Sequence, residues 1–373
     1  MIVCSRCVMD QTDSKISFDT NGICDHCRTF DKDIAPYWLP SDDGAGFSHI
    51  VKKIKKAGEG KEFDCIIGMS GGVDSSYLTY LAKEVLGLRP LVFHVDAGWN
   101  SEEAISNIEN IIEKLELDLY TEVISWKEMR DLQLAFLKSG VPHIDAPQDH
   151  AFFATMYKFA AKYKIKHILT GGNYSTECVR NPKEWMYYQS DDRQLRDIHN
   201  KFGEIPLKSF PVTNVIWHKF YLPYFKGIRV YRPLDYMTYN KEKATQLLVK
   251  NFNFKRYEQK HFESRFTKFY ESYWLAKRFG FDTRKVQFSS LILTGQMKRD
   301  EALKNLALPA YNIDKISQDI KFVANKLEIT VDELQSYLDS PNKTFKDYKN
   351  REFIYKLGAK ILKLFRIEKG GKR

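Results

Sequence analysis

The sequence predicts an α/β protein with a parallel sheet and helices on both faces, preceded by a zinc ribbon and followed by a helical region. Three observations predict this. Two C-x2-C pairs stand near the N-terminus, short apolar runs alternate with helical patterns as far as residue 234, and strand signals end near Asn240. We therefore expect a ribbon over residues 1–40, an α/β domain over 41–240 and a helical substrate or partner region over 241–373.

The ribbon is predicted from two cysteine pairs, CSRC and CDHC. The segment between them, ISFDTNGI, carries the Asn21-Gly22 signature of a hairpin turn. Each C-x2-C turn presents two thiolates to one metal, and four thiolates leave no coordination position open for a substrate. We expect a structural Zn²⁺ site, with four incidental thiols as the alternative. The predicted ligands are Cys4, Cys7, Cys24 and Cys27.

Five strands are predicted in the α/β domain. Helical patterns separate them, at residues 75–86 and 102–115 and onward from residues 126 and 149. Short β-branched runs between helices are typical of a parallel sheet, in which ligands bind at the carboxyl ends of the strands. The apolar runs that predict the strands lie at residues 63–70, 89–96, 119–125, 167–173 and 228–234.

Charge is distributed unevenly along the 373 residues. The net charge is +10, but residues 341–373 hold eleven Lys and Arg against three Asp and Glu, which accounts for +8 of it. The near-neutral remainder argues against nucleic acid as a partner. The sequence contains no apolar run of membrane-spanning length and no secretory pattern at its N-terminus, so we expect a cytoplasmic protein.

The stretch GMSGGVDSSYL, at the end of the first predicted strand, indicates an anion-binding loop. Glycines let backbone N–H groups approach an anion closely, and the helix that follows adds its positive end. We expect phosphate or pyrophosphate here, with a bare strand-to-helix turn as the alternative. The loop lacks the lysine of a G-x-x-x-x-G-K-[ST] nucleotide loop, and it lacks the G-x-G-x-x-G dinucleotide fingerprint.

SGGVDSS resembles the SGGxDS signature of the PP-loop ATP pyrophosphatases, which cleave ATP between its α and β phosphates. HVDAGWN and GGNYSTE, at the ends of later strands, extend this resemblance. It implies an adenine nucleotide alpha hydrolase-like fold that uses ATP and Mg²⁺, with Asp74 and Glu177 as magnesium ligands. The nucleotide-binding residues that it implies are Ser70, Gly71, Gly72, Val73, Asp74, Ser75, Ser76, His94, Val95, Asp96, Gly171 and Asn173.

Residues 1–340 also resemble the N-acetyl sugar amidotransferases of surface polysaccharide biosynthesis, of the WbpG/PseA type. The resemblance rests on CSRCVMDQTD, DAPQDHA, RPLDYMTYNKEKA and the long stretch from KHFESRF to MKRDEAL. It implies that the enzyme adenylates the acetamido oxygen of a nucleotide-linked or acidic N-acetyl sugar of lipopolysaccharide or a related glycan. Ammonia then gives an acetamidino sugar, with release of AMP and pyrophosphate.

Such chemistry needs a base and charge-neutralising groups. Two alternatives remain open: a tRNA thiolation enzyme, although Cys65 and Cys178 form no C-x-x-C pair, and a non-enzymatic nucleotide-binding scaffold. The candidates for catalysis are Asp74, Asp149, His150, His261 and Glu263, and those for substrate binding are Arg265, Arg284 and Lys285.

The nitrogen source is expected to be a separate glutaminase, similar to the histidine-pathway pair HisH/HisF. Residue 2 is Ile2 and not the exposed cysteine of an N-terminal nucleophile, and neither FDCIIG nor TECVRN forms a glycine-flanked nucleophile elbow. The tail at residues 351–366 has one apolar and one basic face. It predicts peripheral membrane or partner contact, or packing on its own domain.

Overall fold

The computed structural model describes residues 2–364 and contains one five-stranded sheet in the order β3-β2-β1-β4-β5, with every pairing parallel. All five predicted strands are confirmed. The three inner strands, β1, β2 and β4, are apolar and buried, as expected for a sheet covered on both faces, whereas the edge strands β3 and β5 are mostly exposed. The strands are β1 Cys65–Gly68, β2 Pro90–Asp96, β3 Leu119–Val123, β4 His167–Leu169 and β5 Arg229–Tyr231.

The strand order reverses at β1. The chain passes from β1 outward through β2 to β3, and then crosses to β4 on the other side of β1. In such sheets a crevice opens at the carboxyl ends of the two strands where the order reverses. The residues that follow β1 and β4 therefore lie at one place, and they include the glycine loop (residues 70–76) and Gly171 to Asn173.

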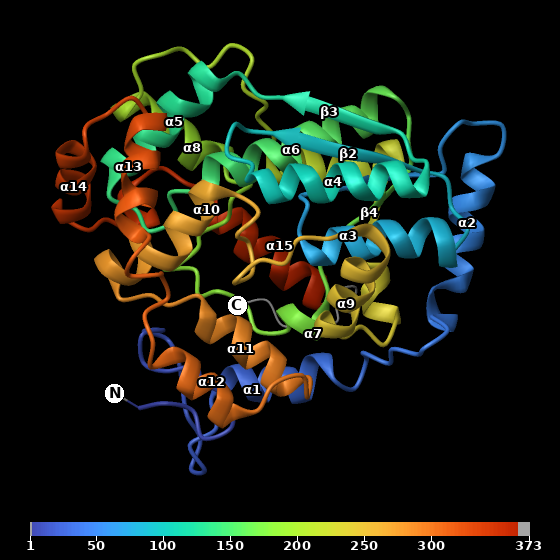
Figure 1. Ribbon diagram of the computed structural model, residues 1–373, viewed down its shortest axis with the longest axis horizontal. Coiled ribbons are helices and arrows are strands. Elements are labelled where there is room, and N and C mark those ends of the chain that lie inside the picture. Colours follow the sequence, from blue (N-terminus) through green and yellow to red (C-terminus); the bar gives the residue numbers. More distant parts are fainter. Residues whose placement is uncertain (1, 365–373) are drawn as a thin grey trace.

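Two helical layers cover the sheet, because successive strand residues point to opposite faces. Ile66 belongs to a core with Phe136 of α5 and Phe159 of α6, whereas Ile67 belongs to a core with Ile54 of α2 and Leu78 of α3. Figure 1 shows α3, α4 and α9 on one side of the strands. The layer helices are α2 Ser48–Gly58, α3 Val73–Tyr80, α4 Glu102–Leu115, α5 Trp126–Ser139, α6 Ala146–Lys162, α8 Asp192–Phe202 and α9 Lys241–Phe252.

Helix boundaries differ from the predicted ones in a few places. The helix predicted from Ser75 begins at Val73 and continues as a π-helical segment, Leu81–Val85. The helix predicted from Asp149 begins at Ala146, because Pro147 suits the first turn of a helix. Three elements were not predicted: α7 Tyr174–Glu177, which is a single turn, the amphipathic helix α8, and the π-helical segment Trp217–Lys226, which contains Pro223.

The N-terminal segment is compact and small. An antiparallel bridge joins Phe18 to Cys24 across the predicted turn, where Gly22 has φ +73°, and α1 follows at Asp25–Thr29. Arg299 donates to the carbonyl oxygens of Cys7 at 3.0 Å and Cys4 at 2.8 Å. The ribbon thus docks on the C-terminal helices, and Figure 1 shows α11 and α12 beside α1.

After β5 the described chain has helices and no further strand, as predicted. Buried aromatic residues such as Phe266, Phe269 and Trp274 form the core of this region together with Leu327 and Leu334. Its helices after α9 are α10 Arg265–Phe269 with its π-helical continuation Tyr270–Phe279, α11 Arg284–Leu293, α12 Arg299–Leu306, α13 Ile316–Lys326, α14 Val331–Asp339 and α15 Glu352–Leu364.

The start of α15 packs on the α/β domain. The ring of Tyr355 stacks on Tyr188 with centroids 4.0 Å apart, and Arg351 pairs with Asp192. The opposite face exposes Phe353 and Leu357. Residues 365–373, the end of the predicted basic tail, lie outside the described residues. Among residues 2–364, no helix has the length and apolar character needed to cross a membrane.

Candidate functional site

The glycine loop is shaped by close contacts that only glycine allows. Gly71 has φ +82°, and a Cβ there would lie 2.7 Å from the carbonyl oxygen of Ala104 in α4. A Cβ on Gly72 would lie 2.6 Å from a carboxylate oxygen of Glu263. A larger residue at either position would push the loop off α4 or displace Glu263, so the two glycines fix the path of the backbone.

Hydroxyl groups line this loop. The Oγ atoms of Ser70 and Ser75 lie 3.3 Å apart, and the amide of Gly72 donates to Ser70 Oγ at 3.2 Å. The hydroxyl of Ser76 is buried with no hydrogen-bond partner among the described residues. Together with the N-terminal amides of α3, which begins at Val73, these donors suit a phosphate or pyrophosphate group.

The loop after β4 packs directly on this helix start. A Cβ on Gly171 would lie 2.9 Å from the backbone nitrogen of Ser75, so glycine is required for the approach. Asn173 is fully buried, and its side chain accepts from the amide of Thr176 at 2.9 Å and so caps α7. Asn173 therefore holds α7 in place, and through it Glu177, instead of pointing its amide at the phosphate site.

Two carboxylates and a lysine meet beside the loop. The Lys260 ammonium lies 2.6 Å from Glu177 and 3.5 Å from Asp74, and Tyr239 donates a hydrogen bond to Asp74. Burial raises the pKa of Glu177, but the charge and hydrogen bond of Lys260, together with the charges of His261 and Arg232, outweigh burial and lower that pKa. Likewise, burial lowers the pKa of Lys260 less than Glu177 and Asp74 raise it.

This arrangement fits the predicted magnesium ligands. Asp74 and Glu177 direct carboxylate oxygens at one cationic group, and hard oxygen donors are what Mg²⁺ prefers. The two carboxylates come from separate elements, α3 and α7, which the close packing at Gly171 brings together.

Segments from beyond the sheet close over the loop. Tyr257 donates to the carbonyl oxygen of Gly71 at 3.0 Å, and Ser70 donates to Glu263 at 3.2 Å. The amide of Ser101, after β2, donates to the carbonyl oxygen of Glu263 at 2.9 Å. The stretch between α9 and α10 thus contacts two strand ends and forms one wall of the site.

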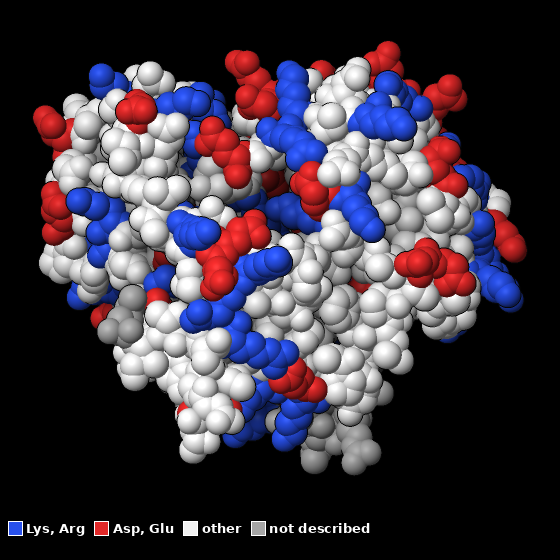
Figure 2. All heavy atoms as spheres, turned by 60° about the horizontal axis from the view of Figure 1, so that its bottom comes forward, with Lys and Arg blue, Asp and Glu red and all other residues white. Residues whose placement is uncertain are grey.

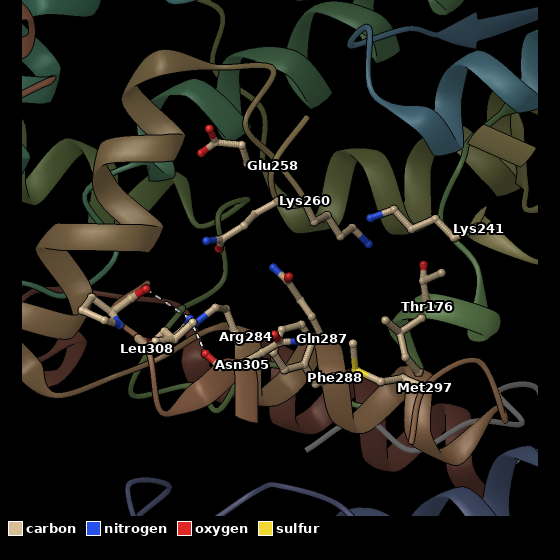
Figure 3. A pocket seen from close by; sticks show the side chains of 13 residues that line it. Thr176, Lys241, Glu258, Lys260, Arg284, Gln287, Phe288, Met297, Asn305 and Leu308 are labelled. Atoms are coloured by element: carbon tan, nitrogen blue, oxygen red, sulfur yellow. Dashed lines mark hydrogen bonds between the residues drawn. The ribbon is translucent and has the colours of Figure 1, made fainter. Parts of the chain in front are cut away.

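A cavity of about 410 Å³ opens next to this cluster. Figure 2 shows one face of the molecule hollowed, with Lys, Arg and acidic side chains around the hollow. In the close-up, Lys241 and Gln287 point into the cavity, while Arg284 turns toward Leu308 and Asn305 (Figure 3). The lining residues that bear on its chemistry are Thr176, Lys241, Lys260, Gln287 and Met297.

The four ribbon cysteines form a cluster in which all the sulfur atoms lie within 4.8 Å of one another. All four side chains are buried, and the Sγ atoms of Cys7 and Cys24 lie 3.6 Å apart. Sulfurs about 2.3 Å from a tetrahedral zinc ion would be about 3.8 Å apart. The cluster therefore has the donors and the dimensions of a four-thiolate zinc site.

Known families match two parts of the chain. Residues 263–362 match the C-terminal domain of the LPS biosynthesis protein WbpG-like family, and residues 47–143 match NAD synthase. The second match contains the glycine loop, and the first contains the Glu263 that contacts it. Together the two matches support a PP-loop superfamily protein with a WbpG-like C-terminal domain.

A curated relative matches part of this PP-loop protein. An uncharacterized protein of Methanocaldococcus jannaschii is 32% identical over 187 residues, which is 48% of this chain and 63% of that protein. The chain thus spans somewhat less than two thirds of its relative's length.

Solved structures give only weak overall likenesses. An NMN synthetase from Francisella tularensis has a TM-score of 0.32 at 16% identity, covering 76% of this chain and 93% of its own. An NH3-dependent NAD synthetase from Campylobacter jejuni has a TM-score of 0.33 at 13% identity, and the match covers 80% of this chain and 98% of the synthetase. A U34-tRNA thiolase from Methanococcus maripaludis has a TM-score of 0.31 at 14% identity, and the match covers 80% of this chain and 90% of the thiolase.

The stretch from His94 to Asp96, predicted to bind the nucleotide, ends β2 beside the PP-loop. His94 is buried, with Nδ1 2.8 Å from the carbonyl oxygen of Met69 and Nε2 2.9 Å from the amide nitrogen of Asn100. Asp96 accepts from the amide of Gly98 at 2.8 Å, and Val95 is buried. The side chains of His94 and Asp96 thus hold the turn after β2.

Four predicted residues lie in places that do not suit their predicted roles. His150 is fully buried, and its ring nitrogens bond the carbonyl oxygen of Gln189 at 2.7 Å and the amide of Thr213 at 3.0 Å. Burial lowers the pKa of His150 to about 4. With both nitrogens held by backbone groups, His150 joins segments of the α/β domain and does not fit a catalytic base.

The three cations predicted to bind substrate are engaged within the protein. Lys285 lies 2.6 Å from the buried Asp10 and ties the ribbon to α11, and Arg265 packs on the ring of Phe322. Arg284 lines the cavity, but it pairs with Asp282 and donates to carbonyl oxygens that end α12. All three side chains thus serve helix packing. The prediction missed this because sequence alone does not reveal the partner of an arginine or lysine.

Other residues of the site were missed. Lys241 points into the cavity, and Lys260, Tyr239 and Tyr257 contact the PP-loop or its carboxylate. Burial lowers the pKa of Lys241, against the opposing charge of Asp74. No local pattern in TYNKEKA or EQKHFES marks these residues, because their partners come from distant segments of the chain.

Proposed function

We propose that this PP-loop enzyme is an ATP-dependent amidotransferase that converts the acetamido group of an N-acetylated sugar into an acetamidino group. One observation carries the proposal. Glu263, the first residue of the WbpG-like match, contacts Ser70 and Gly72 of the PP-loop, with Lys260 between Asp74 and Glu177 close by. The WbpG-like region is therefore part of the site where ATP would react.

In the first step, the amide oxygen of the sugar attacks the α-phosphorus of ATP and pyrophosphate leaves. Ser70, Ser75 and Ser76 and the loop amides would bind the leaving pyrophosphate, whose charge is otherwise a barrier to attack. Asp74 and Glu177 would hold Mg²⁺, which neutralises phosphate charge when bound. Lys260 and Lys241 add positive charge on the cavity side.

In the second step, ammonia attacks the activated carbon. A C–N bond forms, the C–O bond to AMP breaks, and AMP leaves with the electron pair. A base must first take a proton from ammonium. Glu263 is the candidate closest to the loop. His261 lies 2.9 Å from Glu271. Burial lowers the pKa of His261, but the charge and hydrogen bond of Glu271 raise it to about 9. A protonated His261 suits binding of an anion better than proton abstraction.

The substrate is proposed to be a nucleotide-linked or acidic N-acetyl sugar of surface glycan biosynthesis. The cavity beside the PP-loop offers Lys241 and Lys260 together with the apolar surface of Met297, which suits an anionic group joined to a sugar. The four-cysteine cluster would carry Zn²⁺ as a structural ion, because it lies at the ribbon surface that docks on α12.

Ammonia is proposed to come from a separate glutaminase. Burial raises the pKa of Cys178 to about 11 and raises that of Cys65 as well, and both thiols are buried. A nucleophilic cysteine needs a lowered pKa and access to substrate. The raised pKa values and the burial of Cys65 and Cys178 likewise give no support to the tRNA thiolation alternative.

The test is to incubate the protein with ATP, Mg²⁺, ammonium and a panel of nucleotide-linked N-acetyl sugars. We expect AMP and pyrophosphate in equal amounts and a sugar product in which oxygen is replaced by NH. Release of ADP and phosphate, or AMP formation that needs tRNA and no sugar, would contradict the proposal.

A further inference from the structure

Two acidic residues predicted to act at the site lie on helices of very different length. Asp149 belongs to the long helix α6 and lies 3.5 Å from His143, whereas Glu177 belongs to α7, which has only four residues. In an α-helix each carbonyl oxygen accepts from the amide four residues further along, so a helix this short leaves carbonyl oxygens without a partner inside it. A single turn is also unfavourable on its own, because it fixes several residues for few hydrogen bonds. The position of Glu177 therefore depends on groups outside α7.

Side chains from α11 and from the turn after it satisfy the end of α7. Thr294 donates to the carbonyl oxygen of Ser175 at 2.7 Å, and the side-chain nitrogen of Gln296 donates to the same oxygen at 2.9 Å. The amide of Val179 donates to Ser290 Oγ at 3.0 Å. In a longer helix, this amide would donate to the carbonyl oxygen of Ser175. The C-terminal region thus supplies both of the partners that a longer helix would supply itself.

The hydroxyl of Thr294 has one hydrogen and three carbonyl oxygens within reach. The carbonyl oxygens of Ser290 and Leu291, in the preceding helix, lie at 3.0 and 3.4 Å, and that of Ser175 lies at 2.7 Å. The shortest contact is therefore the one that crosses to α7. Gly295, with φ +73°, turns the chain directly after Thr294 and lets the next side chain reach the same oxygen.

Gln296 also connects α7 with the cavity. Its side-chain oxygen accepts from the backbone amide of Lys241 at 3.0 Å. Lys241 is the first residue of α9, whose first amides have no acceptor within the helix, and its ammonium points into the cavity (Figure 3). A backbone amide can only donate and a carbonyl oxygen can only accept, so the two partners fix the orientation of the Gln296 amide group. One side chain thus sets the separation between the helix that carries Glu177 and the helix that carries Lys241.

The helix α11 and the turn after it belong to the WbpG-like region, residues 263–362. The ribbon supports α11 from another side, because the fully buried Ser289 accepts from the amide of Val8 at 3.2 Å. Neither Thr294 nor Gln296 is among the residues that line the cavity. These two side chains therefore act on the site through α7 and α9, and not by contact with a ligand in the cavity.

We propose that Thr294 and Gln296 are positioning residues of the ATP site, which hold Glu177 and Lys241 at the separation that Mg²⁺-bound ATP requires. The inference rests on the proposed function, because that function assigns Glu177 to Mg²⁺. It gives the WbpG-like region a second role, beside the contact of Glu263 with the PP-loop. Without the two side chains, α7 would open locally more often, and its carboxylate would be in place for the metal less of the time.

Three substitutions and a control test the two residues. Thr294→Val keeps the shape of the side chain but removes the donor to Ser175, and Thr294→Ser keeps a donor. Gln296→Met has a similar length and removes both hydrogen bonds of the amide group. The matched control is Gln335→Met in α14 of the same region, whose amide donates to the exposed side of Asp339.

Metal binding without turnover is the main readout. Mn²⁺ replaces Mg²⁺ and is followed by electron paramagnetic resonance in the presence of α,β-methylene-ATP, which cannot be cleaved between its α and β phosphates. We expect the dissociation constant of Mn²⁺ to rise about threefold in Thr294→Val and about tenfold in Gln296→Met, which loses two hydrogen bonds. Thr294→Ser should regain most of the affinity, and the control should match the wild type. Unchanged binding in both Thr294→Val and Gln296→Met would overturn the proposal.

Hydrogen exchange of the protein without nucleotide or Mn²⁺ separates positioning from a general loss of packing. The peptide that spans residues 174–180 should exchange faster in Gln296→Met than in the wild type, whereas peptides from α13 and α14 should exchange at the same rate. Faster exchange throughout the C-terminal region would mean that the side chain holds that region as a whole, which contradicts a specific effect on α7.

The same measurements keep the two proposals distinguishable. If the variants weaken Mn²⁺ binding as expected but the wild type converts no N-acetyl sugar into an amidine, the amidotransferase function is wrong and the positioning role stands. If the wild type converts the sugar and the variants bind Mn²⁺ normally, the positioning role is wrong and the function stands. A wild-type protein that binds no Mn²⁺ with the ATP analogue would overturn both.

Discussion

The ammonium nitrogen of Lys260 lies 2.6 Å from a carboxylate oxygen of Glu177. Lys260 precedes the WbpG-like region, whereas Glu177 ends the short helix after β4. The same nitrogen is 3.5 Å from Asp74 at the start of α3. Three segments far apart in the sequence thus balance their charges at the carboxyl edge of the sheet, next to the loop that would bind pyrophosphate.

Asp74→Asn should nearly abolish pyrophosphate release. It removes a charged oxygen donor proposed for Mg²⁺ and changes no core group, so the fold should be retained while turnover falls by about 100-fold or more. Circular dichroism and a pyrophosphate assay measure the two effects. Glu103→Gln on the neighbouring helix α4 is the matched control and should retain activity. Near-wild-type turnover of Asp74→Asn would contradict the proposed role.

Lys241 and Arg284 line the same cavity but should respond differently to replacement by methionine. Lys241→Met should raise the KM for ATP or the sugar by about tenfold, equivalent to about 1.4 kcal/mol, with little change in the free energy of unfolding. Arg284→Met should cost about 2–3 kcal/mol of stability, because it removes the charged partner of Asp282 and leaves the carbonyl oxygens at the end of α12 without their side-chain donor. Urea unfolding and steady-state kinetics distinguish the two. The opposite pattern would mean that Arg284 contacts substrate.

Cys7→Ser should lower the zinc content of the purified protein and loosen the contact between the ribbon and Arg299. Loss of one of four thiolates weakens a structural zinc site, and zinc binding contributes directly to folding. Cys178→Ser, which alters a buried thiol outside the cluster, is the control and should keep its zinc. A soluble Cys7→Ser protein with a full complement of zinc would show that the cluster is not a zinc site.

The His261–Glu271 pair predicts a pH-dependent contribution to stability. The pKa of His261 is raised to about 9, so the contribution is fully present below the ordinary histidine pKa of about 6.5 and is lost as pH rises through about 9. Lys260 and Glu263 also face this imidazole and act in opposite directions. The difference in free energy of unfolding between wild type and Glu271→Gln should shrink between pH 6.5 and 9 to a constant offset. A difference that grows over this range would contradict the pairing.

Periodicity and composition were sufficient to predict the five strands, the glycine loop and the four-cysteine cluster, because each has a local signature. The loop depends on Gly71 and Gly72, and the SGGVDSS motif that contains them identifies it. Long-range packing decides the rest. Nothing local distinguishes Arg284, whose side chain donates to carbonyl oxygens at the end of α12, from Lys241, which points into a cavity of about 410 Å³. Likewise, whether a histidine such as His150 is held by backbone groups depends on segments that are distant in sequence.

In the proposed reaction the acetamido oxygen attacks ATP, and oxygen-18 labelling follows the fate of that oxygen. A sugar substrate labelled with oxygen-18 in its acetamido carbonyl is incubated with the protein, ATP, Mg²⁺ and ammonium, and the AMP is analysed by mass spectrometry. We expect the label to appear in the phosphate of AMP in proportion to the amidine formed. Unlabelled AMP, or label recovered in free phosphate, would contradict it.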